Sequence, residues 1–282
     1  MSKSRCLICG ASQQPSRLPG LLRCQSCGFV TANITLSDNE LRRIYSEKYF
    51  KGEEYRDYID ERPTIEKHFR LRLRTLLRFV PPSRRIRLLE IGSAYGFFLC
   101  VAKDHFAEVQ GIDIAEAAVQ YANEEVRVPV ALGDFLKYQP LGSFDVACLW
   151  DTIEHVPAPH LYLEKVARHL NPGGVVAITT GDIGSLVARL RGPKWRQIHP
   201  PSHLHYFSRH TLTRLLSNYG LTVRYGRYDG MYRRLDMIAH IILRVRHQQH
   251  RLYRFIKKTG LLEHDIYLNL RDIMFVIAEK TH

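Results

Sequence analysis

Residues 87–96 read Arg-Leu-Leu-Glu-Ile-Gly-Ser-Ala-Tyr-Gly, and this stretch decides the fold of the chain. An apolar run ends in an acid, Glu90, and two glycines precede the next apolar run, Phe97–Ala102. The pattern predicts a buried strand that turns sharply through glycine into a helix. Gly92 and Gly96 carry no Cβ, so the backbone of the turn can approach a ligand closely. The carboxylate of Glu90 favours a cationic ligand over a pyrophosphate, because a pyrophosphate prefers the bare amides of a helix N-terminus.

Strands and helices alternate after this turn. The expected strands are Val109–Asp113, Val128–Leu132, Phe144–Trp150 and Val175–Thr180, and the expected helices between them are Ala115–Asn123 and Leu161–Leu170. Such an alternation predicts an α/β fold with a doubly wound, mostly parallel sheet. Before the turn, Thr64–Val80 repeats apolar residues at helical spacing and predicts an amphipathic helix at the sheet edge. The face opposite its apolar stripe is expected to carry Arg70, Arg72, Arg74 and Arg78.

Acidic residues recur where the expected strands end. Asp113 stands 23 residues after Glu90, at the place where a nucleotide-binding α/β unit holds a ribose diol. Gly133-Asp134-Phe135 follows the third strand and could offer a carboxylate to an adenine amine and a ring to its face. Asp151 follows the fourth strand. Such sheets bind ligands in the crevice outside the carboxyl ends of their strands, so these acids are expected to face one crevice.

Together these motifs resemble the motif series of class I S-adenosylmethionine (SAM) methyltransferases. The resemblance runs from about Thr64 to Tyr228, and its segments are Glu90–Gly96, Asp113, Gly133–Phe135, Asp151–Val156 and the turn Asn171–Gly174. It is strongest to the ubiquinone-methylase-like branch, in which an acidic strand end precedes a Glu-His pair. The family implies SAM as cofactor and a seven-stranded sheet whose closing strand, here Ile273–Glu279, runs antiparallel.

The resemblance also implies which residues bind the cofactor. They are Glu90, Gly92, Ser93, Ala94, Tyr95, Gly96, Asp113, Ile114, Asp134, Phe135 and Asp151. The chain departs from the family at Ala94, where a middle glycine is common. A small side chain at this position narrows the pocket without closing it.

Two cysteine pairs near the N-terminus predict a zinc site. Cys6-Leu-Ile-Cys9-Gly and Cys24-Gln-Ser-Cys27-Gly are separated by fourteen residues, and the glycine after each pair permits the positive φ of a tight knuckle. Four thiolates from two knuckles make a closed tetrahedral Zn²⁺ site with no open position, so its expected role is structural. The other two cysteines lie in apolar runs and are expected in the core.

A second, partial likeness bears on the acceptor. Sugar C-methyltransferases of antibiotic pathways also carry a zinc module ahead of this domain. They have Glu-His-Leu-Ser-Tyr-Phe-Ser where this chain has Ser-His-Leu-His-Tyr-Phe-Ser at residues 202–208. An oxygen or carbon acceptor needs a base, and histidine has a suitable pKa near neutrality. The likeness favours His203 as this base, and His155, four residues after Asp151, is the second candidate.

The sequence divides into three expected parts. Residues 1–32 form the zinc-binding knuckle module, residues 33–63 a helical lid or linker, and residues 64–282 the methyltransferase domain. This last part carries a basic helical insertion at about residues 230–270. Within it, Tyr232–Lys258 is expected to form one long helical stretch with an apolar stripe.

Charge is distributed unevenly along the 282 residues. Lys and Arg number 41 against 28 Asp and Glu, yet from Leu88 to Ile183 there are five basic and thirteen acidic residues. The basic flanks predict a polyanionic partner or an anionic membrane surface, or else they serve solubility. The sequence shows no N-terminal signal and no apolar run near the roughly 20 residues of a membrane span. A cytoplasmic protein with reduced thiols, peripheral to a membrane if the basic insertion meets lipid, is therefore expected.

Three functions follow from these features. The first is SAM-dependent methyl transfer to oxygen or carbon of a small molecule or glycan. The second is methylation of RNA, with the zinc module and the basic flanks gripping phosphates. Against it, residues 151–154 read Asp-Thr-Ile-Glu where base N-methyltransferases carry an Asn-Pro-Pro-Tyr-type tetrapeptide. The third is a non-catalytic SAM-binding scaffold, which the complete series of cofactor acids disfavours.

Overall fold

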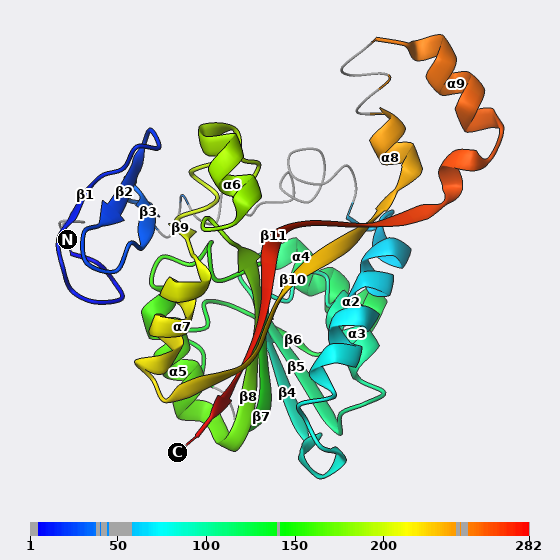
Figure 1. Cartoon of the computed structure of the whole chain (residues 1–282). Helices are drawn as coiled ribbons and strands as arrows, with labels where there is room; N and C mark the ends of the chain where they lie inside the picture. The colour runs from blue at the N-terminus through cyan, green and yellow to red at the C-terminus, as the bar shows by residue number, and fades with distance from the viewer. Residues whose placement is uncertain are drawn as a thin grey trace.

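The computed structural model describes residues 5–37, 58–139, 142–240 and 248–281, together with residues 40, 44 and 243. Its central element is a seven-stranded sheet in the order β10-β11-β8-β7-β4-β5-β6 (Figure 1). The strands are β4 (Arg87–Ile91), β5 (Glu108–Asp113), β6 (Val130–Leu132), β7 (Phe144–Trp150), β8 (Leu170–Gly181), β10 (Leu221–Arg234) and β11 (Asp265–Lys280). Strand β11 runs antiparallel to β10 and β8, and the remaining pairs are parallel. The predicted mostly parallel sheet with an antiparallel closing strand is confirmed.

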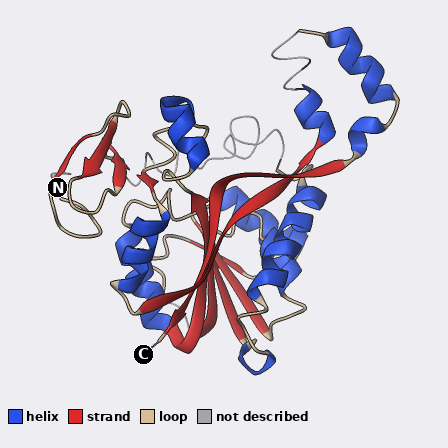
Figure 2. Ribbon diagram, in the orientation of Figure 1, coloured by secondary structure: helices blue, strands red, loops and turns tan. Residues whose placement is uncertain are grey.

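Helices cover both faces of the sheet because its strands are apolar on both sides (Figure 2). In β4, Leu88 belongs to one core cluster, whereas Leu89 and Ile91 belong to the other. Alternate residues of a strand point to opposite faces, so a strand with apolar residues at successive positions must be covered twice. The cluster around Leu88 includes residues of α2 (Arg62–Leu76), α3 (Phe97–Ala102) and α4 (Glu116–Tyr121), and the other includes residues of α5 (Pro159–His169) and α7 (Arg209–Ser217).

Several short elements connect these layers. Helix α6 (Leu186–Arg191) follows β8, and α7 begins at a capping box in which Ser208 accepts from the Thr211 amide. The remaining turns are the 3-10 segments Pro82–Arg84, Gly192–Lys194 and Leu261–Glu263 and the π-helical turn Ala122–Val126.

The N-terminal cysteine module is attached to the main domain through a shared sheet. Strands β1 (Gln13–Pro15), β2 (Leu21–Cys24) and β3 (Val30–Ala32) form an antiparallel sheet, and β9 (His205–Tyr206) adds a fourth strand. Val30 pairs with Tyr206 and Thr31 with His205. The segment that carries the candidate base His203 is therefore held against the module.

The helical stretch expected over Tyr232–Lys258 is confirmed only in part, since α8 (Leu235–Ala239) and α9 (His250–Lys258) lie within it but its first three residues form a strand. Tyr232, Arg233 and Arg234 continue β10 and pair with residues 265–267 of β11, because the two antiparallel strands extend past the sheet as a two-stranded ribbon. The ribbon carries α8 and α9 away from the sheet (Figure 1). We call residues 231–268 the arm; of these, residues 241–242 and 244–247 lie outside the described part of the chain.

The expected position of Arg72 on the polar face of its helix is also wrong. Its side chain is 3% exposed, whereas Arg70 and Arg74 on the same helix are exposed. Arg72 stands seven residues after Ile65 and four before Leu76, which places it on the apolar stripe of α2 rather than opposite it.

Most of the expected lid over residues 33–63 lies outside the described residues, including four of its five aromatic residues. Its last residues, from Tyr58 onward, are described and lead into α2. Among the residues that the structure describes, no helix combines the length and apolarity needed to cross a membrane.

Candidate active site

A cavity of about 650 Å³ lies at the carboxyl ends of β4, β5, β6 and β7. Parallel strands end on the same side of a sheet, so the segments that follow them meet there. These segments line one wall of the cavity with residues 90–94, 112–114, 132–135 and 150–152. The opposite wall comes from α2 and from residues 231–233 at the start of the arm.

The turn after β4 forms the floor of the cavity. Gly92 has a φ of 74°, and a Cβ on it would lie 2.6 Å from the side chain of Thr152, so glycine is required there. Ala94 also has a positive φ, of 45°, a region that glycine occupies at lower cost. Tyr95 and Gly96 do not line the cavity: the ring of Tyr95 stacks at 5.4 Å on that of Tyr58, which does line it.

Asp113 fixes this turn from the end of β5. Its Oδ2 accepts a hydrogen bond from the Ala94 amide at 2.8 Å, and its Oδ1 accepts one from the Ala115 amide at 2.9 Å. Burial raises the pKa of the carboxyl group, and these backbone donors counteract the rise. Each carboxylate oxygen has further lone-pair capacity, so Asp113 can hold the turn and still accept from a ribose diol in the cavity.

Glu90 provides the strongest test of whether SAM fits here. The residue is 2% exposed, and its Oε2 has no hydrogen-bond partner among the described residues. Burial, followed by the charge of Asp113, raises its pKa well above the usual range. A buried carboxylate oxygen without a partner is costly, and a cation beside it would stabilise its charged form. The cationic amino acid end of SAM is such a group, so the residues of this wall fit the cofactor.

Asp134 and Phe135 are positioned by helix α5. Asp134 Oδ1 accepts from the Tyr162 hydroxyl at 2.7 Å, and the Lys165 ammonium donates to the carbonyl of Phe135 at 2.7 Å. Phe135 is 2% exposed, and its ring packs against Tyr162 with 5.6 Å between centroids. The ring that the sequence offered to adenine is thus also a core residue, and Asp134 keeps a carboxylate at the cavity wall.

Arg72 joins the two walls of the cavity through two ion pairs. Its Nη1 lies 3.1 Å from Asp151 Oδ2, and its Nε lies 2.9 Å from Asp229 Oδ2. Burial lowers the pKa of the guanidinium, but the two carboxylates outweigh that effect and raise it. The guanidinium also lies 5.3 Å from the centroid of the Trp150 ring. Asp151, with a φ of 50°, is held in a strained conformation at this junction.

The two candidate bases lie side by side but differ in access. His155 lines the cavity, whereas His203 is 6% exposed and is not among the lining residues; their ring centroids are 4.5 Å apart. Burial lowers the pKa of His155 to about 4 and that of His203 well below its usual value. Beside them, burial and then the charge of Asp151 raise the pKa of Glu154 to about 8. The cluster is therefore uncharged near neutrality, and His155 is the member that an acceptor in the cavity would meet.

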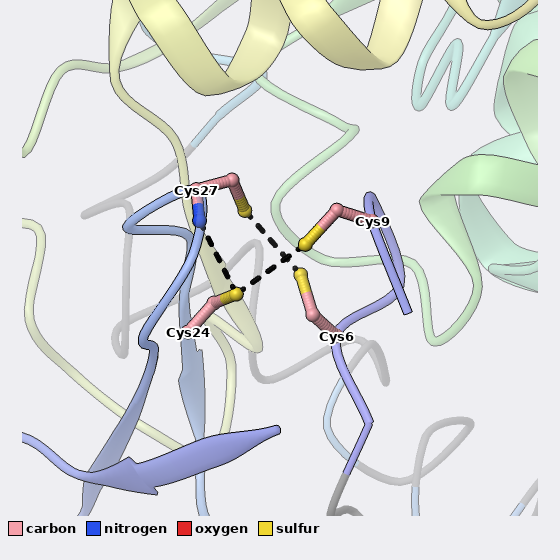
Figure 3. A group of neighbouring side chains, drawn as sticks. All are labelled: Cys6, Cys9, Cys24 and Cys27. Carbon is pink, nitrogen blue, oxygen red and sulfur yellow. Dashed lines mark hydrogen bonds between the residues drawn. The ribbon is translucent and has the colours of Figure 1, made fainter. Parts of the chain in front are cut away.

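The four N-terminal cysteines converge on one point (Figure 3). The Sγ atoms of Cys6 and Cys27 are 3.5 Å apart, and those of Cys9 and Cys24 are 3.4 Å apart. Four sulfurs around one Zn²⁺ at about 2.3 Å would be roughly 3.8 Å from each other, so the group needs only a slight expansion to hold the ion. The amides of Ile8 and Cys27 donate to sulfur, each at 3.4 Å, which supports the thiolate form.

Sequence reasoning did not find Arg72, nor Tyr162 and Lys165, which anchor the loop at Asp134 and Phe135. The signal for Arg72 was its spacing along α2, at which His68 also falls on the buried face. Tyr162 and Lys165 carried no local signal, because their partners lie 27–30 residues earlier in the chain.

Comparisons with known proteins agree with this geometry. A family model described as a methyltransferase domain matches residues 65–225. The ubiquinone biosynthesis O-methyltransferase of Maricaulis maris is 31% identical over 106 residues, which cover 35% of this chain and 42% of that enzyme. The one from Alkalilimnicola ehrlichii is 29% identical over 171 residues, covering 53% and 68% respectively. The chain thus spans less than half the length of the first relatives that it matches.

A solved structure shows the same fold. The SAM-dependent methyltransferase of Thermotoga maritima superposes with a TM-score of 0.54 over 86% of this chain and 100% of its own, at 19% identity. A second one, from Clostridium acetobutylicum, has a TM-score of 0.52 over 77% of this chain and 92% of its own, at 9% identity. At these identities the likeness concerns the fold alone.

Replacing Asp113 with alanine should weaken SAM binding by about 1–3 kcal/mol, which is roughly 5- to 150-fold in Kd. The variant would remove the acceptor expected for the ribose, and it releases the turn that Asp113 holds through Ala94. Calorimetric titration with SAM measures the change, and Asp104→Ala, at an exposed position, serves as the matched control. Unaltered binding in Asp113→Ala would show that the cofactor does not contact this residue.

Proposed function

Because this chain belongs to the family of class I SAM-dependent methyltransferases, we propose that it methylates a hydroxyl oxygen of a small molecule or glycan. The main support for the proposal is that Glu90, Asp113 and His155 all line one cavity. Bound SAM supplies a methyl group on a sulfonium: the acceptor oxygen forms the new O–C bond, the C–S electron pair stays on sulfur, and the hydroxyl proton leaves.

Three acids on the wall formed by the sheet would each bind a different part of the cofactor. Asp113 would accept from the ribose hydroxyls, Asp134 from the adenine amine, and Glu90 from the cationic amino acid end. Holding both reactants in line is the main contribution that a protein makes to such a displacement. The glycine turn at Gly92 allows this approach because any side chain there would collide with Thr152.

The acceptor side of the cavity is formed by His155, Arg72 and the arm residues Met231–Arg233. His155 Nδ1 lies 2.9 Å from the carbonyl oxygen of Ser202, which can only accept, so Nδ1 carries the proton and the lone pair is on Nε2. A hydroxyl group bound beside His155 could donate its hydrogen bond to the lone pair of Nε2. The names of the relatives, O-methyltransferases, support oxygen as the methylated atom.

Transfer of a labelled methyl group from SAM to a panel of hydroxylated small molecules, glycans and RNA tests the proposal. We expect label in a hydroxylated small molecule or a glycan, with a rate that barely changes between low and high salt. Methylation of a polyanion should weaken steeply as salt rises, so label in RNA with that salt dependence would replace this proposal with the RNA function. Nuclear magnetic resonance of the product then separates methylation at oxygen from methylation at carbon.

The arm is proposed to rest on an anionic lipid surface. Leu252 and Phe255 are exposed on α9 among cationic residues, and Phe255 is 68% exposed. The hydroxyl of Tyr253 donates to Asp236 at 2.6 Å, which pins α9 to α8. Apolar side chains beside cations match a membrane interface with acidic headgroups. The same ribbon lines the cavity with Met231–Arg233, so an acceptor embedded in the surface would lie near its mouth.

Vesicle sedimentation measures this interaction. Vesicles that contain phosphatidylglycerol should pull the protein down at low salt and release it at high salt, whereas neutral phosphatidylcholine vesicles should not bind it. Arg251→Glu combined with Arg254→Glu should abolish sedimentation, and Arg74→Glu, exposed on α2, should leave it unchanged. If the same fraction of the protein sediments with both kinds of vesicle, an anionic lipid surface is not the partner of the arm.

A further inference from the structure

Three side chains beside the cavity lie close together, and methyl transfer alone does not require this arrangement. Glu154, His155 and His203 each offer one ligand atom, and these atoms lie within 4.8 Å of one another. They come from two loops, after β7 and before β9. The Glu154 carbonyl accepts from the amides of Leu204 at 2.9 Å and His205 at 3.1 Å, so the two loops are held together at this point.

Each of the three side chains is fixed by an outer hydrogen bond. His155 donates its Nδ1–H to the Ser202 carbonyl at 2.9 Å, and His203 donates a ring N–H to the backbone of Gln197. The carboxyl group of Glu154 is hydrogen bonded to the Thr180 side chain. Histidines that bind metals nearly always donate their other ring N–H to a carbonyl or carboxylate, because this fixes the tautomer and directs the lone pair at the ion.

The cluster also contains a buried acceptor atom without a partner. Glu154 is 2% exposed, and its Oε2 has no hydrogen-bond partner among the described residues. Buried polar atoms are normally paired, and an orphaned one in a native fold calls for an explanation such as an ion. A cation bound between Oε2 and the two imidazoles would supply the partner.

We propose that Glu154, His155 and His203 form a second metal site, which binds a divalent first-row transition-metal ion such as Zn²⁺. Two imidazoles and one carboxylate are the ligand set of open catalytic sites, in which a fourth position is left for water or substrate. The four-cysteine group, by comparison, leaves no coordination position open and offers only soft thiolate ligands. Because His155 lines the cavity, the open position is reached from the acceptor side.

The consequence for the reaction rests on the proposed function. A metal-bound hydroxyl loses its proton more readily, as metal-bound water does. The acceptor oxygen would occupy the open position, its proton would pass to solvent, and its remaining lone pair would form the O–C bond. His155 then acts as a metal ligand, and no protein base has to take the proton.

Metal stoichiometry of the full chain tests the site without an activity assay. After dialysis against buffered Zn²⁺, the wild-type protein should hold two ions, and Glu154→Gln and His203→Ala should each hold one. Glu154→Gln preserves shape, so it keeps the test informative if His203→Ala does not fold. Thr180→Val should weaken the second ion about 10- to 100-fold, the usual effect of removing an outer partner. Glu164→Gln and His210→Ala are matched controls at positions away from the cluster, and they should hold two ions.

Substitution with Co²⁺ assigns the ions, because thiolate ligands give intense charge-transfer absorption and a nitrogen–oxygen site does not. Glu154→Gln should keep the thiolate absorption and lose only the second ion. One ion in the wild type, or an unchanged second ion in both ligand variants, overturns the proposal. SAM titration of the same samples separates the two claims: intact SAM binding without a second ion rejects only this site, whereas absent SAM binding in the wild type rejects the proposed function.

Discussion

Replacing Cys9 with serine should release the metal ion from the four-cysteine group and unfold the N-terminal module. The module is small, and its separate core cluster consists of Leu21, Val30 and Ala32 with Tyr206 from β9, whereas Ile8 and Phe29 pack into the core of the main domain. A core of this size cannot offset the entropy of ordering the chain. Structural Zn²⁺ contributes about 10–16 kcal/mol in zinc-finger peptides, and that binding energy is folding energy. Metal analysis and a thermal unfolding curve measure the outcome.

The loss should extend beyond the module, because the module holds the loop that carries His203. Phe29, which is fully buried, stacks on His205 with 5.7 Å between ring centroids, and β3 pairs with β9. We therefore expect Cys9→Ser to make residues 199–208 accessible to limited proteolysis. Cys100→Ser is the matched control: Cys100 is a half-buried cysteine outside the module and should retain the ion. If the Cys9→Ser protein lacks the metal ion but melts like the wild type, a Zn²⁺ ion at the four cysteines does not stabilise the fold.

Replacing Arg72 with methionine should destabilise the fold by about 3 kcal/mol, because it leaves the carboxylate of Asp229, which is 11% exposed, without its counter-charge. Asp151 contributes less to this loss, because its side chain is 44% exposed. Methionine fills similar space, so the lost charge rather than a cavity dominates. Lysine should recover little, since one ammonium cannot reproduce the fork with which Arg72 reaches two carboxylates. Denaturant unfolding measures the shift in midpoint at constant slope.

The exposed Arg74 on the same helix provides the control, and Arg74→Met should change stability by less than about 0.5 kcal/mol. Combining Arg72→Met with Asp229→Asn should restore part of the loss, because the second change removes one of the uncompensated charges. If Arg72→Met unfolds at the same denaturant concentration as the wild type, the two ion pairs do not stabilise the folded state.

Sequence patterns were sufficient for several features that depend on neighbours along the chain. The run that ends at Glu90 and turns through Gly92 predicted β4 and its connection to α3, because strand burial and positive φ are properties of a few adjacent residues. The spacing of Cys6, Cys9, Cys24 and Cys27 brought four sulfurs together for the same reason. The alternation of strands and helices determined the sheet, since parallel strands require helical crossovers.

Only the tertiary structure decided how distant segments meet. It turned Arg72 inward to two carboxylates that stand 79 and 157 residues later in the chain, and it continued β10 as a ribbon where a helix was expected. It also brought the loop at Glu154 against the loop at His203, forming a cluster of which the sequence indicated only the histidines. Local patterns cannot specify such pairs, because a long-range contact depends on how the sheet and the module are packed, not on the spacing of residues within one element. The cavity wall opposite Glu90, Asp113 and Asp134 is built from these long-range contacts.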